Sequence, residues 1–260
     1  MAARAIWKGV IRFGAVRVPV KLYSAVQDRG VHFRLLHAAD RVPVEQRMVH
    51  GGTGDEVPHE QVRKGYEVER GMFVVLEDED LDTLEPEASR EIEVLRFLPR
   101  GGISHQWYDR PYWLGPDGDE EAYFALALGL RRSGREGVAR WVMRKKDYVG
   151  ALRAEGEHLI LNTLRHAEEV VVADELPAPG GRALDPKELQ LAEQLVSALA
   201  DRFDPKQYHD EYRERVHELV AAKAEGQTVA FEPYEERKRP RSLARALEAS
   251  LRAAKERARA

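Results

Sequence analysis

Acidic and histidine side chains are the residues of this sequence that could serve a hydrolytic enzyme. His59-Glu60 and His217-Glu218 each begin the pattern of a zinc protease, but neither has a second histidine at the required spacing. His209 and His217 are eight residues apart on a predicted helix. That separation is about 12 Å along the helix axis, which is too far for one metal ion. We therefore interpret these histidines as surface residues.

Four consecutive acidic residues, Glu77, Asp78, Glu79 and Asp80, allow two interpretations. A metal-dependent nuclease needs carboxylates that converge on one or two Mg²⁺ ions. The N-terminus of a helix favours the same charges without any metal. Because the cluster begins a predicted short helix at 77–84, we favour the structural interpretation and keep the nuclease as an alternative.

Other signatures of an enzyme are missing from the sequence. It contains no phosphate-binding glycine loop, no dinucleotide fingerprint and no nucleophile elbow. It also contains no cysteine, which excludes disulfides, thiol catalysis, iron–sulfur clusters and cysteine-based zinc sites. We therefore predict no catalytic residue, no metal ligand and no cofactor.

Positive charge is concentrated at the two ends of the chain, although the net charge is only −4. Residues 1–65 hold 11 Lys and Arg against 6 Asp and Glu, and residues 237–260 hold 9 against 2. The net charges of +5 and +7 leave −16 for residues 66–236. This asymmetry favours either a surface that binds a polyanion or a solvated surface with a basic tail. Charge alone does not decide between them.

The cations that could contact a polyanion lie around a long loop at 38–65, directly after a predicted strand, and in the C-terminal tail. Contact with phosphate needs cations but no strict spacing. The candidates are Arg34, Arg41, Arg47, Arg63, Lys64, Arg144, Lys145, Lys146, Arg237, Lys238, Arg239, Arg241 and Arg245.

Strands must position most of these residues. Residues 4–23 predict two strands with a turn at Gly14, and apolar residues alternate with polar ones in the second of them, at 16–22. Further strands are predicted at 72–76, 92–98, 108–114, 138–144, 149–154 and 158–164, with a helix at 122–132. Many strands with few helices indicate a closed or nearly closed antiparallel sheet.

Helices are predicted after a linker at residues 177–181. Asp185 and Asp204 are each followed by proline and then by Glu188 or Gln207, the start signals of two helices. One apolar face would contain Leu189, Ala192, Leu195, Val196, Leu199 and Phe203, and the other Tyr208, Tyr212, Val216, Leu219 and Val220. Ser242 could begin a tail helix with Leu243, Leu247 and Leu251. Because that stripe is too narrow to fold alone, we expect disorder or partial helix there.

Several blocks of the sequence resemble bacterial Ku, the DNA-end-binding factor of non-homologous end joining. RAIWKGVIRFGAVRVPVKLYSA at 4–25 is similar to the opening of that family. FRLLHAAD at 33–40, KGYEVERGMFVVLEDEDL at 64–81 and SREIEVLRFL at 89–98 follow in the same order. The block AEQLVSALADRFDPKQYHDEYRERVHELVAAKAEG at 192–226 completes the resemblance, which covers nearly the whole chain to residue 226.

The resemblance implies a mainly β fold with α: a Ku-type β-barrel with a bridging arm and C-terminal helices, assembled as a homodimeric ring. The barrel would occupy 1–182 with the bridge at about 38–65, the helical pair 183–226 and the basic tail 227–260. The implied role is non-catalytic, sequence-independent binding of double-stranded DNA ends, and recruitment of an ATP-dependent DNA ligase. The helices would contribute Leu195, Leu199, Tyr212 and Val216 to the dimer interface.

The sequence departs from the family in the long loop. Many members carry a C-x-x-C-G pattern there, and the matching positions are His50, Thr53 and Gly54. Because tetrahedral zinc usually needs four nitrogen or sulfur ligands, we predict that the loop binds no metal. The loop would then keep its shape by backbone pairing, by partner contacts or by ordering on DNA.

Two alternatives to DNA-end binding remain open: the nuclease, and a protein-only scaffold whose basic tail binds an acidic partner. A membrane is not an expected partner, because the sequence has no run of about 18 apolar residues. It also lacks the unbroken apolar run of a secretory signal. We therefore expect a cytoplasmic, nucleoid-associated protein.

Overall fold

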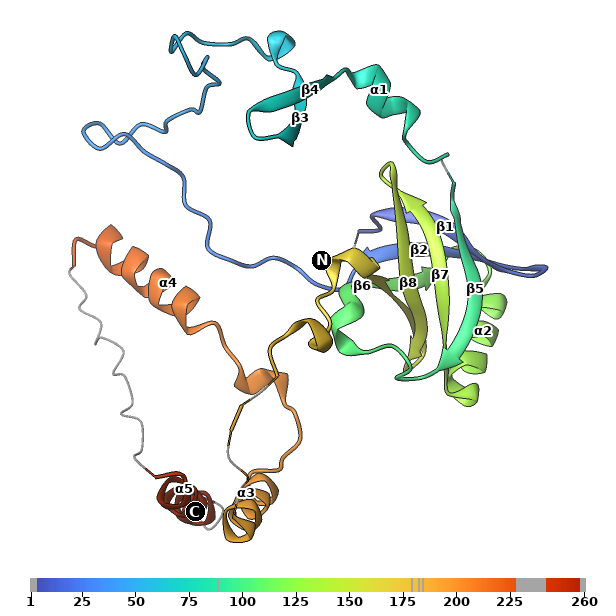
Figure 1. Cartoon of the computed structure of the whole chain (residues 1–260). Coiled ribbons are helices and arrows are strands. Elements are labelled where there is room, and N and C mark those ends of the chain that lie inside the picture. Colours follow the sequence, from blue (N-terminus) through green and yellow to red (C-terminus); the bar gives the residue numbers. More distant parts are fainter. Residues whose placement is uncertain are drawn as a thin grey trace. The chain divides into compact units, whose positions relative to one another are not determined.

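The structure of the chain is a computed structural model, which describes residues 4–87, 89–178, 180–181, 183, 185–227 and 242–257 (Figure 1). The chain divides into two compact units. The first contains the N-terminal strands and Arg34–Glu175, and the second contains Gly30–Phe33 and the chain from Leu176 onward. Among the described residues, no helix is long and apolar enough to cross a membrane.

Seven strands of the first unit close into a barrel, which confirms the predicted β-barrel (Figure 1). Around the barrel they follow the order β1 (Trp7–Phe13), β2 (Val16–Ser24), β6 (Tyr108–Pro116), β9 (His158–Leu164), β8 (Lys146–Glu155), β7 (Arg135–Met143) and β5 (Glu91–Pro99). Six of the seven junctions are antiparallel, as predicted.

The junction between β1 and β5 is parallel, so the prediction of a purely antiparallel sheet was wrong. The two strands pair only from Val10↔Glu91 to Arg12↔Glu93. A tight hairpin forces its two strands to be antiparallel, whereas a long connection allows either direction. Here β5 follows β2 after a long connection, so no tight hairpin fixes the direction of β5 in the barrel.

The core fills the barrel and extends under one helix. Alternate residues of β2 (Val18, Val20 and Leu22) are fully buried, as their spacing predicted. Helix α2 (Glu120–Ser133) packs on the barrel and begins at Asp119, whose side chain accepts a hydrogen bond from the Ala122 N–H. The buried Tyr123 hydroxyl donates to the Leu114 carbonyl at 2.6 Å and accepts from the Leu159 N–H at 2.8 Å. This hydroxyl ties α2 to the ends of β6 and β9.

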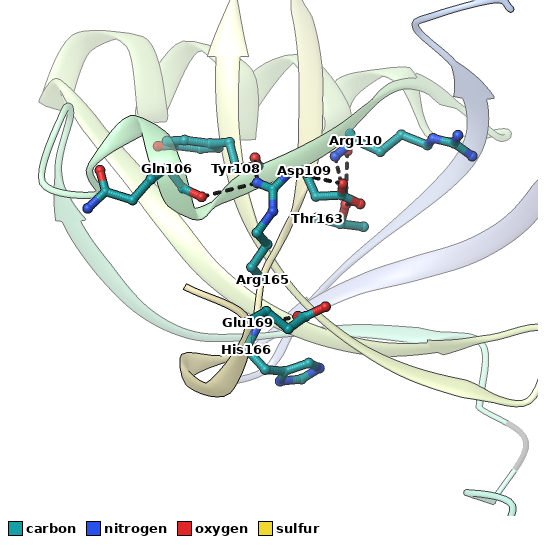
Figure 2. A network of polar contacts seen from close by, with 8 residues as sticks. All are labelled: Gln106, Tyr108, Asp109, Arg110, Thr163, Arg165, His166 and Glu169. Atoms are coloured by element: carbon teal, nitrogen blue, oxygen red, sulfur yellow. Dashed lines mark hydrogen bonds and ion pairs between the residues drawn. The ribbon is translucent and has the colours of Figure 1, made fainter. Parts of the chain in front are cut away.

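A polar network joins the start of β6 to the end of β9 (Figure 2). The β6–β9 register shifts between Tyr108 and Pro111, so part of the β6 backbone loses its strand partner. The Thr163 hydroxyl accepts from the Arg110 N–H at 2.9 Å in its place. The Arg165 guanidinium donates to the carbonyls of Gln106 and Tyr108 (Figure 2). Side chains thus replace the missing backbone hydrogen bonds between β6 and β9.

Residues 34–87, here called the arm, leave the barrel between β2 and β5. None of them is buried. The arm contains the short turn His59–Gln61, the hairpin of β3 (Lys64–Glu69) with β4 (Met72–Leu76), and helix α1 (Asp78–Thr83). The predicted bridge at 38–65 lies inside this segment. The strand at 72–76 and the helix at 77–84 form as predicted.

The second unit contains three helices among its described residues. α3 (Pro186–Ala198) begins with the predicted capping box of Asp185 and Glu188. α4 (Glu211–Ala224) begins later than predicted, because Asp204 caps only the short 3₁₀ turn Pro205–Gln207 and Tyr208 is extended. Phe203 and Tyr208 therefore lie outside both helices, with their rings stacked 5.4 Å apart. Asp210 caps α4 by accepting from the Arg213 N–H.

The tail contains a helix, α5 (Leu243–Arg257), which packs against α3. Leu251 and Ala254 are buried. The expectation of disorder or partial helix treated the leucine stripe in isolation. α3 supplies an apolar partner, and packing of an amphipathic face is what stabilises most short helices.

Candidate nucleic-acid interface

The turn between β7 and β8 presents three consecutive cations. Met143 pairs with Lys146 across the hairpin, which leaves Arg144 and Lys145 as the two turn residues. Both adopt left-handed backbone conformations, with φ of 53° and 63°. Such turns fit the twist of a hairpin and favour Asn and Gly, because other residues are strained there. Two cations nevertheless occupy the tip of this turn.

The three cations differ in their electrostatic surroundings. Lys145 Nζ lies 2.7 Å from a Glu85 carboxylate oxygen and 3.6 Å from one of Asp82. The hydrogen bond to Glu85 raises the pKa of Lys145, with Asp82 adding to the effect. Arg144 and Lys146 have no carboxylate partner among the described residues. Their charge is therefore available to an outside anion, whereas that of Lys145 joins the turn to the base of the arm.

The candidate cations of the arm likewise divide into those with and those without a carboxylate partner. Arg47 pairs with Glu56, Arg63 with Glu77, and Lys64 with Asp78, at 2.8 to 3.2 Å. Arg34 and Arg41 are exposed and have no carboxylate partner within the described part of the chain. Exposed ion pairs contribute little stability, so a phosphate could displace the carboxylates at small cost. At Arg34 and Arg41 a phosphate would have no carboxylate to displace.

One exposed cation of the arm was missed in the sequence. Arg70 occupies the turn between β3 and β4, and no carboxylate pairs with it among the described residues. The signal that could have found it is the Arg70-Gly71 pair between two strand-like segments, where Gly71 has a φ of 80°.

The remaining predicted residues belong to the second unit. Arg245 lies exposed on α5, while Arg237, Lys238, Arg239 and Arg241 are outside the described residues. The four predicted dimer residues differ in their exposure. Leu199 and Tyr212 are 60% and 64% exposed, whereas Leu195 and Val216 are half-buried. Their assignment stays a prediction.

Two turns of the arm share one construction, and His50 lies in the second. In the first, residues 36–43, the His37 ring contacts the Asp40 carboxylate at 2.8 Å and Arg41 has a φ of 61°. The Val42 N–H and, less strongly, His37 lower the pKa of Asp40.

In the second turn, residues 49–56, His50 Nδ1 accepts from the Thr53 N–H at 3.2 Å and Gly54 has a φ of 79°. Backbone pairing and these side-chain contacts close both turns. In the second turn they do so at the positions where the family pattern has its cysteine pair.

Purified protein should therefore contain no stoichiometric zinc. Among the described residues, no group of three or more His, Cys, Asp or Glu side chains is gathered to hold a metal ion. We expect a chelator to leave the midpoint of thermal unfolding unchanged, because hydrogen bonds rather than metal–ligand bonds close the turns. Elemental analysis and calorimetry provide the measurements, and about one zinc per chain would contradict the prediction.

The acidic cluster of the nuclease alternative has structural roles. An Asp80 oxygen accepts from the Glu77 N–H at 3.0 Å in a capping box at the start of α1. Glu77 and Asp78 pair with Arg63 and Lys64. Three of the four carboxylates are thus engaged with the chain itself, which favours the structural interpretation.

The sequence that forms the barrel and its arm matches a known domain. A family model described as Ku70/Ku80 beta-barrel domain matches residues 12–193. The chain belongs to the Ku family. Three relatives resemble it over most of both chains, and each is named a non-homologous end joining protein Ku.

The relative from Geotalea uraniireducens, named Ku 2, is 38% identical over 89% of this chain and 90% of its own. The relative from Coxiella burnetii is 38% identical over 90% and 88%, and that from an Anaeromyxobacter species is 39% identical over 98% and 87%. The match to Ku relatives therefore extends beyond the barrel into the helices of the second unit.

Proposed function

We propose that this protein binds the ends of double-stranded DNA in non-homologous end joining, as a homodimeric ring and without catalysis. In the same proposal it protects the ends and recruits an ATP-dependent DNA ligase. The names of its relatives support the pathway. The observation that carries the mode of binding is the arm, a segment of 54 residues (34–87) with no buried residue, set between strands of a closed barrel.

The arm cannot be explained as part of the core of its own chain. Its hairpin exposes Tyr66, Met72 and Phe73 by 66%, 57% and 59%. An isolated two-stranded hairpin is marginally stable in water, and contiguous exposed apolar surface usually marks an interaction site. A second copy of the chain is the proposed partner for the apolar residues, and DNA is the proposed partner for the cations.

Selectivity for ends follows from topology rather than from base contacts. Cations that contact phosphate provide affinity but carry no sequence information. Arg34 and Arg41 on the arm, with Arg144 and Lys146 on the barrel, supply exposed charge without a carboxylate partner in the described chain. A ring lined by such charges can reach the duplex only from an end. Neither ATP nor a catalytic metal is required for this.

Binding to duplex DNA without cleavage tests the proposal against both alternatives. Labelled linear duplex should bind the purified protein with a similar affinity for every sequence and should remain intact when Mg²⁺ is added. Shorter products in the presence of Mg²⁺ would establish the nuclease. A failure to bind linear duplex at low salt would favour the protein-only scaffold. Heat-denatured protein serves as the control for a contaminating nuclease.

Replacing Leu199 by Asp should disrupt the dimer and leave the protomer folded. Leu199 is 60% exposed and lies just after α3, so the new carboxylate stays in water within one subunit. If a partner covers Leu199, the charge would be buried without a counterion, which costs several kcal/mol. The mass in solution should fall from dimer to monomer, with an unchanged circular dichroism spectrum.

The matched control is Val171→Asp, which places the same charge at a side chain that is 66% exposed and belongs to neither predicted helical face. A Leu199→Asp variant that remains a dimer would remove Leu199 from the interface.

A further inference from the structure

An apolar groove lies between α2, the β1–β2 hairpin and β5, and none of its lining residues is assigned above to DNA or to the dimer. It has a volume of about 620 Å³. Its walls include Phe13 and Val16 of the β1–β2 hairpin, Phe97 of β5, and Ala125, Gly129 and Leu130 of α2. Figure 1 shows the β1–β2 hairpin extending past β5, with α2 beside them.

The barrel strands diverge at this groove. β1 pairs with β5 only as far as Arg12↔Glu93 and then turns back at Gly14, whereas β5 continues to Pro99. The edge of β5 at residues 95–98 that would continue this pairing has no strand partner among the described elements. Leu95 and Phe97 on this stretch are 51% and 36% exposed. An unpaired strand edge beside an apolar groove is the combination that binds an extended peptide.

Gly129 supports an occupant from outside the chain. A glycine within a helix destabilises it relative to alanine, so a close neighbour often explains its presence. A Cβ atom at Gly129 would have no heavy atom within 4 Å, and its backbone φ lies outside the left-handed region. Packing within the chain therefore does not require glycine here. A side chain would instead project into the groove and fill it.

The charge of the groove indicates the chemistry of that occupant. Arg135, which pairs with Pro99 across the β5–β7 ladder, is the one charged residue in the lining. Arg131 and Arg132 lie in the last turn of α2. Within the described residues, none of these three arginines has a carboxylate partner. An apolar segment that carries a carboxylate would match both the walls and this basic end.

We propose that this groove docks an extended peptide segment of a protein partner, with alternating apolar side chains and a carboxylate that meets Arg135. The segment would add a short strand to β5 at residues 95–98 and place its apolar side chains between β5 and α2. This surface is independent of DNA binding, so it would stand even if the proposed function failed.

A random dodecapeptide library, selected on the full-length protein, provides the probe. The selected peptides should share alternating apolar residues and at least one Asp or Glu. Gly129→Leu should weaken their binding at least about tenfold by filling the groove. Its unfolding midpoint should be unchanged or raised, since the substitution relieves a helix of glycine.

The matched control is Gly51→Leu, which adds the same side chain at another position with no atom within 4 Å. It should leave peptide binding unchanged.

Two further variants test the charge and the backbone pairing. Arg135→Gln should weaken the binding of acidic peptides and leave the binding of their Asn or Gln analogues unchanged. Arg70→Gln in the arm should change the binding of neither. N-methylation of alternate peptide residues should abolish binding in one register and not in the other, because a strand added at an edge donates only every second N–H. N-methylation that is tolerated at every position would overturn the strand pairing.

Other outcomes would overturn the proposal as a whole. Selected peptides that are basic, or that bind the Gly129→Leu variant unchanged, would exclude this groove as their site. A shift of that variant from dimer to monomer would make the groove a contact between copies. If a synthetic peptide of residues 243–257 competes with the selected peptides for binding, the chain's own C-terminal helix would be the occupant.

Discussion

Linear duplex DNA should load the protein efficiently, whereas relaxed, covalently closed circles of the same length and sequence should retain almost none. A closed ring has no entrance on a circle, and the phosphate contacts are the same on both substrates. Blocking both ends of the linear DNA after loading should trap the protein, so that a salt challenge no longer releases it. Gel-shift and pull-down measurements on the two topologies provide the comparison.

The same circles cut once by a restriction enzyme form the matched control, because only the ends differ. Loading should appear on cutting and disappear when the ends are blocked beforehand. Equal binding and equal release on circles and linear DNA would show that the dimer is an open clamp or a surface binder. The arm would then need a role other than closing around the duplex.

Raising the salt from about 50 to 200 mM should lower the affinity for linear DNA by roughly 10⁴-fold, if the ring neutralises about eight phosphates. Replacing Arg144, Lys145 and Lys146 together by Ala should weaken binding to every sequence alike. The slope of log affinity against log salt should become shallower by about 0.9 for each phosphate no longer neutralised, since each neutralised phosphate releases condensed counterions. A salt titration of binding to two unrelated duplexes measures both effects.

The single variants should not be equivalent. Arg144→Ala and Lys146→Ala should each flatten the slope, because neither residue has a carboxylate partner among the described residues. Lys145→Ala should flatten it less, since Lys145 already pairs with Glu85 at 2.7 Å. Equal effects of all three would mean that phosphate displaces Glu85. An unchanged slope in the triple variant would place the turn away from DNA.

The elements of the fold were largely predictable because their signals are local. Alternation along β2 and the capping box of Asp185 and Glu188 each depend on a few neighbouring residues, and both predictions were confirmed. The start of α4 was predicted wrongly for the same reason. Asp204 and Asp210 are both local capping signals, and the sequence does not show that the turn after Asp204 stops at Tyr208.

The candidate site was predictable in composition but not in electrostatics. Charge asymmetry pointed to cations at the long loop, and the basic triplet at 144–146 pointed to the β7–β8 turn. It could not separate Lys145 from Arg144 and Lys146, because the partners of Lys145 lie about sixty residues earlier in the chain. Coulomb interactions depend on distances in space, and these are fixed only when α1 and the turn are brought together.

By itself the sequence determined the β-barrel class, most element boundaries and the Ku resemblance, because hydrophobic period, caps and ordered blocks are written along the chain. Only the tertiary structure decided how the barrel closes through the parallel β1–β5 junction. It also decided which cations are neutralised, and that α3 gives the tail helix an apolar partner. The physical reason is common to all three: each depends on residues far apart in sequence that become neighbours only after folding.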